Sequence, residues 1–136
     1  VLETIALIGS EIGELAREYI INGYCDSFSE ELADIILRSL DLAYWQKILI
    51  ADNFKTVVVT WNKRGHLEDI LELTIDFSKL VNSVRNDSDN PDFKRYLITI
   101  ILRAIEIADI NNIDIENAVR KKMEINEQRG TRGRLL

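Results

Sequence analysis

An internal repeat is the feature that most constrains this chain. Residues 28–43, FSEELADIILRSLDLA, align without a gap on residues 93–108, FKRYLITIILRAIEIA, and seven of the sixteen positions are identical. The same shift of 65 residues places Glu11 over Asp76 and Leu15 over Leu80. The chain therefore carries an internal duplication, with copies at about 1–65 and 66–130, and the two copies are expected to fold alike.

The periodicity of apolar residues predicts an all-α fold in one domain. The 136 residues include only six Gly and one Pro, which favours long helices over a turn-rich β fold. We expect helices at about 2–22, 27–50, 66–84, 90–110 and 114–129, with a capping box of Ser27 and Glu30 at the second start. The sequence ends in a predicted flexible tail, 131–136.

The segment 52–65 is ambiguous. Val57, Val58 and Val59 favour a strand by propensity. The repeat sets this segment over the last helix, and we therefore expect a helix.

Charge and composition limit the partners. The formal charge of -6 argues against polymeric nucleic acid and anionic membranes as partners. No apolar run is long enough to cross a bilayer. Cys25 is the one cysteine, so no disulfide framework is available. This lone cysteine and an opening that lacks a basic signal-peptide start predict a cytoplasmic protein.

Two acidic pairs fall inside the apolar stripes of the first two helices. Glu11 and Glu14 are three residues apart on one helix, and Glu31 and Asp34 on the next. If these faces meet, four carboxylates converge and need a cation between them, and Mg²⁺ prefers such oxygen ligands. The alternative is a set of surface ion pairs on each helix, from Glu14 to Arg17 and from Asp34 to Arg38.

The second copy keeps the apolar positions but loses most of the acids. Three acidic positions carry other residues there: Lys79 for Glu14, Tyr96 for Glu31 and Thr99 for Asp34. Only the first copy is then expected to bind a metal. Lys79 is a candidate to neutralise Asp76, the remaining acid of the second copy.

These motifs, E-x-x-E, E-x-x-D within EELADIILRSLDLA, and the distal KMEINEQR, resemble the MazG-like all-α nucleoside triphosphate pyrophosphohydrolases. That superfamily includes dimeric dUTPases, dCTP pyrophosphatases and phosphoribosyl-ATP pyrophosphohydrolase. Its motif has a further glutamate where this chain has Ser10. The resemblance implies a helical bundle of two homologous halves, a pseudo-dimer within one chain. The residues that it implies as catalytic and Mg²⁺-binding are Glu11, Glu14, Glu31 and Asp34, and those implied as phosphate-binding are Lys122, Asn126 and Arg129.

The implied reaction is Mg²⁺-dependent hydrolysis of a nucleoside triphosphate to the monophosphate and pyrophosphate, as in house-cleaning of nucleotide pools. The alternative is a chain that has lost activity and acts as a nucleotide-binding or protein-interaction scaffold. For the three phosphate-binding candidates the alternative is a solvated helix end. Pairing of two chains into a homo-dimer is possible through exposed apolar faces.

The large aromatic residues are expected in the core, with stacking on a nucleobase as the alternative. They are Tyr44, Trp45, Trp61 and Tyr96. His66 has no ligand set beside it and is expected at a cap or on the surface.

Overall fold

The computed structural model describes residues 2–23, 27–54, 57, 59–86 and 91–129. Within these ranges the chain forms helices and no strand, which confirms the predicted all-α fold. The helices are α1 (Leu2–Asn22), α2 (Phe28–Trp45), the short α3 (Ile50–Asn53), α4 (His66–Asn86), α5 (Pro91–Ile110) and α6 (Ile115–Gln128). The predictions for the first, third, fourth and last long helices hold to within two residues at each end.

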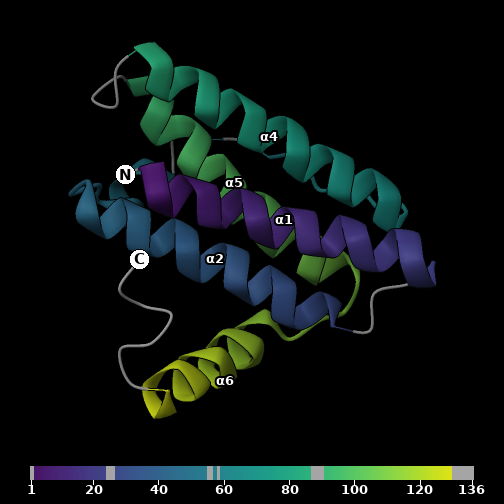
Figure 1. The fold of residues 1–136 in the computed structure, drawn as a ribbon. Helices are drawn as coiled ribbons and strands as arrows, with labels where there is room; N and C mark the ends of the chain where they lie inside the picture. The colour runs from purple at the N-terminus through teal and green to yellow at the C-terminus, as the bar shows by residue number, and fades with distance from the viewer. Residues whose placement is uncertain (1, 24–26, 55–56, 58, 87–90, 130–136) are drawn as a thin grey trace.

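Four long helices form the body of the bundle. α1 packs on α2 and α4 packs on α5, while α1 also lies against α4 and α2 against α5 (Figure 1). α6 crosses below this body and packs mainly on α2. Apolar side chains from all four helices fill the centre, and Leu15, Leu32, Leu80 and Leu97 are fully buried there. The core is continuous across both halves of the chain.

α2 ends at Trp45, earlier than the predicted end near residue 50, because a left-handed residue follows it. Lys47 has φ 56°, and the amide of Ile48 donates to the carbonyl of Ala43. This is a Schellman turn, whose 6→1 hydrogen bond closes a helix. α5 ends in the same way 65 residues later, where Asn112 has φ 57° and the amide of Ile113 donates to the carbonyl of Ala108.

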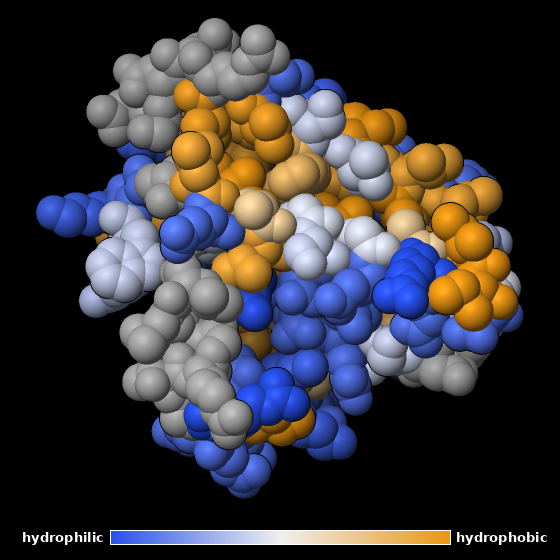
Figure 2. Space-filling view, viewed as in Figure 1, coloured by the Kyte–Doolittle hydropathy of each residue, from blue (hydrophilic) through white to orange (hydrophobic). Residues whose placement is uncertain are grey.

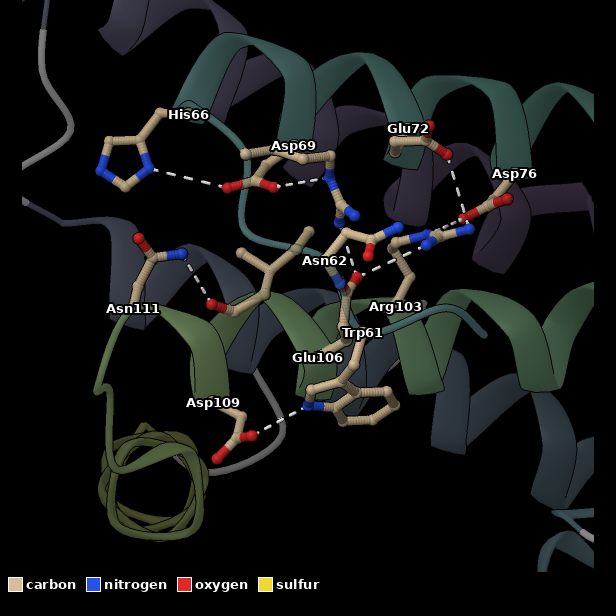
Figure 3. Close-up of polar contacts among 12 residues, drawn as sticks. Trp61, Asn62, His66, Asp69, Glu72, Asp76, Arg103, Glu106, Asp109 and Asn111 are labelled. Atoms are coloured by element: carbon tan, nitrogen blue, oxygen red, sulfur yellow. Dashed lines mark hydrogen bonds and ion pairs between the residues drawn. The ribbon is translucent and has the colours of Figure 1, made fainter. Parts of the chain in front are cut away.

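Residues 59–65 are not helical, so the helix expected over 52–65 is wrong beyond α3 and the single 3₁₀ residue Phe54. The segment lies along α5 and bonds to its side chains instead of to its own backbone (Figure 3). Trp61 Nε1 donates to Asp109 Oδ2 at 2.8 Å, and the backbone amide of Asn62 donates to Glu106 Oε2 at 3.1 Å. The bond from Asn62 satisfies a backbone amide that a helix would have bonded internally, and the bond from Trp61 holds its indole ring against α5.

The start of α2 also differs from the prediction. Ser27 is the N-cap residue, but its side chain makes no capping bond to the helix. Its amide and hydroxyl instead both donate to the carboxylate of Glu18 on α1. The capping box with Glu30 is therefore wrong, and Ser27 ties the start of α2 to α1. At α6, Asp114 does cap the helix and accepts from the amide of Asn117.

The surface carries more large apolar side chains than expected. Tyr44 is 77% exposed, Trp45 70% and Trp61 47%, so their predicted place in the core is wrong. Tyr96 is partly buried against the core, and His66 begins α4. None of the described helices combines the length and apolar character needed to span a membrane. Cys25 and the tail 131–136 lie outside the described residues.

Figure 2 shows hydrophobic side chains gathered over α1 and α4 and hydrophilic ones over α2 and α6. On α4 the exposed Leu67, Leu71 and Ile75 are spaced at four residues and form one stripe. This stripe suits the expected pairing of two chains, which stays a prediction.

Candidate metal centre

Two adjacent helices bring the predicted acids together. α1 carries Glu11 on the face that also buries Ile8 and Leu15, and α2 carries Glu31 and Asp34 next to the buried Ile35. Carboxylate oxygens of Glu11, Glu31 and Asp34 all lie within 4.8 Å of one another. We call these three residues the acidic cluster. The helical packing thus turns the two sequence motifs into one site.

Glu14 lies at the rim of the acidic cluster. Its side chain is exposed, and it is not among the three clustered residues. Its charge and a hydrogen bond with Glu31 nevertheless help to raise the pKa of Glu31. Ser10, the residue directly before Glu11, is also exposed.

Burial and mutual repulsion disfavour the charged forms of the cluster. Burial is the largest cause that raises the pKa of Glu31 to about 9, and contacts with Glu11 and Glu14 add to it. Burial and the negative charge of Asp34 raise the pKa of Glu11. The pKa of Asp34 is also raised by burial, against the opposing charge of Lys122. Without a cation the cluster therefore holds a proton at neutral pH.

The donor set fits a hard divalent cation. Glu31 Oε2 is buried and has no hydrogen-bond partner among the described residues. A buried carboxylate oxygen without a donor is costly, and a cation removes that cost. Three carboxylates on two rigid helices are ligands of the kind that Mg²⁺ uses together with water and phosphate. Glu11, Glu31 and Asp34 are thus suited to hold Mg²⁺.

Two cations accompany the acidic cluster. Lys122 Nζ on α6 lies 3.3 Å from Asp34 Oδ2, and both side chains are less than one fifth exposed. Arg38 Nε on α2 lies 3.8 Å from Glu11 Oε1. Lys122 was predicted as a phosphate-binding residue, and the structure places it beside the acids. Lys122 belongs to the opposite half of the chain, and it reaches the acids because α6 packs on α2.

Cavities flank the Lys122–Asp34 pair between α2 and α6. A cavity of about 460 Å³ opens on the side of Asp34 and Arg38, and Asn126 and Met123 line it. Another of about 380 Å³ opens on the side of Lys122 and Lys121. Small-molecule sites have volumes of about 300–1,000 Å³. Space for a ligand thus adjoins Asp34 of the acidic cluster on one side and Lys122 on the other.

The remaining predicted phosphate ligands differ in their positions. Asn126 is partly buried and lines the larger cavity. Arg129 caps the end of α6, is exposed, and lies outside both cavity linings. The structure therefore brings Lys122 and Asn126 to the cluster, whereas it leaves Arg129 at the helix end.

Arg38 is a site residue that the sequence motifs did not suggest. The repeat could have indicated it. Of the seven positions that are identical in the two copies, six are apolar and the seventh is Arg38, which matches Arg103. In the second half, Arg103 Nε donates to Asp76 Oδ2 at 2.9 Å, as Arg38 approaches Glu11 in the first. An arginine opposite the acid of α1 or α4 is thus common to both halves.

Asp76 is neutralised by Arg103, which corrects the expectation that Lys79 does so (Figure 3). Arg103 also contacts Glu106 at 3.4 Å and Glu72 at 3.5 Å, and only 13% of its side chain is exposed. The charge of Lys79 acts on Asp76 more weakly than that of Arg103. A planar guanidinium can bind several carboxylates at once, whereas an exposed ammonium prefers water.

Comparisons of the chain with protein-family models, with curated proteins and with solved structures found no match.

Proposed function

We propose that this chain hydrolyses nucleoside triphosphates to nucleoside monophosphates and pyrophosphate, with Mg²⁺ held by Glu11, Glu31 and Asp34. The observation that carries the proposal is the acidic cluster with its unpartnered Glu31 Oε2, set beside Lys122 and a cavity of about 460 Å³. The proposed substrates are ribo- or deoxyribonucleoside triphosphates, and nucleotide-pool house-cleaning is the corresponding role.

The carboxylates of the site would have two roles, metal coordination and proton transfer. Mg²⁺, when bound, would bind the triphosphate and lower the pKa of a water. Carboxylate oxygens of Glu11, Glu31 and Asp34 would coordinate the ion. One carboxylate of the site would accept the proton of the attacking water. The water oxygen bonds to the α-phosphorus, and the bridging bond to the β-phosphate breaks.

Lys122 and Arg38 are the cations placed to meet the phosphates. In the structure Lys122 pairs with Asp34, and Arg38 approaches Glu11. Once a divalent ion takes over those carboxylates, both cations are available to phosphate oxygens. Positive charge near the departing pyrophosphate stabilises the transition state of phosphoryl transfer. Asn126 lines the same cavity and can donate its amide.

We also propose that the chain is a pseudo-dimer in which the second half lost its acids and kept a supporting role. α6 of the second half supplies Lys122 to the acids of the first half. The matching turns after α2 and α5, and the matching pairs Arg38–Glu11 and Arg103–Asp76, support this origin.

The test is pyrophosphate release from a panel of ribo- and deoxyribonucleoside triphosphates with Mg²⁺. Glu31→Gln should reduce the rate at least about 100-fold because it removes a metal ligand, and Lys122→Ala about tenfold or more. Glu3→Gln makes the same chemical change at an exposed acid of α1; it is the matched control and should keep full activity. Silence of the folded protein across the whole panel would refute hydrolysis and leave a binding scaffold.

A further inference from the structure

The second half contains its own pocket at the position of the lost acidic site. A cavity of about 330 Å³ is lined by Val57, Asp76, Lys79, Arg95, Tyr96, Thr99 and Arg103. Six of these lie 65 residues after Glu11, Glu14, Glu30, Glu31, Asp34 and Arg38, and Val57 lies 65 residues before Lys122. This pocket therefore lies at the positions equivalent to the acidic cluster, and each of those positions except Arg103 carries a different residue.

The charge of this lining is reversed. The seven equivalent positions, six in the first half and Lys122 on α6, carry five acids and two cations, a formal charge of -3. The second-half pocket has one acid and three cations, a formal charge of +2. The single acid, Asp76, is already paired with Arg103 at 2.9 Å. The pocket thus favours an anion where its counterpart favours a cation.

The remaining polar groups are suited to oxyanions. Arg95 lies over the Tyr96 ring at 5.1 Å from its centroid and donates to the Tyr96 hydroxyl at 3.3 Å. That hydroxyl still has its own proton to donate. Arg95 also pairs with Asp92, but both side chains are more than half exposed, so this contact is weak. Lys79 is exposed on α4 and lines the same pocket.

We propose that this pocket binds a phosphate or pyrophosphate group, with Lys79, Arg95 and Tyr96 as its ligands and without a metal ion. Its volume is at the small end of ligand sites, which fits a phosphate group better than a whole nucleotide. Glu72 and Glu106 hold Arg103 from outside the lining, so the surplus positive charge comes from Lys79 and Arg95. The proposal is independent of hydrolysis at the acidic cluster.

The test is calorimetric titration of the full chain with sodium pyrophosphate, in low salt and EDTA. EDTA removes divalent ions, so the acidic cluster cannot attract phosphate through a metal. We expect one pyrophosphate per chain, weakened about tenfold by Lys79→Ala and by Arg95→Ala, since each removes a charged donor. Both side chains are exposed, so neither change should disturb folding.

Two control variants locate the anion. Lys94→Ala removes the same charge from α5, but Lys94 does not line the pocket, and the affinity of this variant should stay within about twofold of the wild type. Lys122→Ala tests the alternative that pyrophosphate binds beside the acidic cluster instead of in this pocket. Absence of binding by the wild type, equal losses in Lys79→Ala and Lys94→Ala, or a loss confined to Lys122→Ala would each overturn the proposal.

A parallel titration with adenosine monophosphate identifies the source of the phosphate. Tighter pyrophosphate would indicate a free anion, and tighter monophosphate a nucleotide that carries its phosphate into the pocket. Either preference supports the site if Lys79→Ala weakens it.

Discussion

Replacement of Glu31 by glutamine should change how the stability of the metal-free protein depends on pH. The pKa of Glu31 is raised from 4.5 to about 9 in the folded chain, chiefly by burial. Between these values the folded state binds a proton that the unfolded state releases. The free energy of unfolding therefore falls as pH rises through this window and levels off above the folded pKa. A glutamine side chain is neutral throughout and lacks this contribution.

The magnitude follows from the size of the window. One unit of pKa corresponds to about 1.36 kcal/mol, so a rise from pH 6 to 8 would cost about 2.7 kcal/mol if the group were fully enclosed. Glu31 is only partly buried, and solvent screening reduces the expected loss to about 1 kcal/mol. Between pH 6 and pH 8, the free energy of unfolding of Glu31→Gln should therefore fall by about 1 kcal/mol less than that of the wild type.

The assay is urea unfolding in EDTA at pH 6, 7 and 8, followed by circular dichroism. Glu3→Gln, which removes an exposed carboxylate from α1, should keep the wild-type slope. Parallel pH dependences for the wild type and Glu31→Gln would refute the buried, protonated Glu31 described above. Its high pKa also means that metal affinity should rise with pH, because the ion needs the deprotonated carboxylate.

Other predictions concern the metal and the packing. Saturating Mg²⁺ at about 100 times its dissociation constant should raise the free energy of unfolding by about 2.7 kcal/mol, and Asp34→Asn should remove most of this gain in thermal melts. Arg103→Met should cost about 3 kcal/mol in urea unfolding because it leaves the buried carboxylate of Asp76 without its cation, whereas Lys79→Met should stay within about 0.5 kcal/mol. Equal effects would contradict the assignment of Arg103. Gly9→Ala should destabilise by about 1–3 kcal/mol because its Cβ would lie 2.7 Å from Phe77 Cζ, while Gly13→Ala meets no atom within 4 Å and should stabilise by about 0.5–1 kcal/mol. A stabilising Gly9→Ala would show that Phe77 moves aside freely.

The long helices and the meeting of the acids could be predicted because both depend on helical periodicity. Glu11 lies in the same stripe as Ile8 and Leu15, so burying the stripe had to bury the carboxylate. The end of α2 was also available from the repeat, since Asn112 ends α5 and Lys47 occupies the equivalent position. Lysine gives no signal for a left-handed turn, and the propensity of residues 46–50 therefore misled the prediction.

The rest depended on tertiary contacts that no local pattern encodes. Residues 59–65 lie along α5 because Asp109 and Glu106 accept hydrogen bonds from Trp61 and Asn62. These bonds join residues more than 40 positions apart, so propensity and the repeat both failed there. Arg103 was missed as the partner of Asp76 for the same reason, since 27 residues separate the two in sequence.

The packing between the two helix pairs has a consequence for how the chain unfolds. α1 lies on α4 and α2 lies on α5, so each pair covers apolar side chains of the other within one continuous core. If one helix pair unfolds, the core side chains of the other pair become exposed to water. We therefore expect the two halves to unfold together in one cooperative transition and not one after the other. This shared core gives the second half a structural role in addition to any part that its residues take in ligand binding.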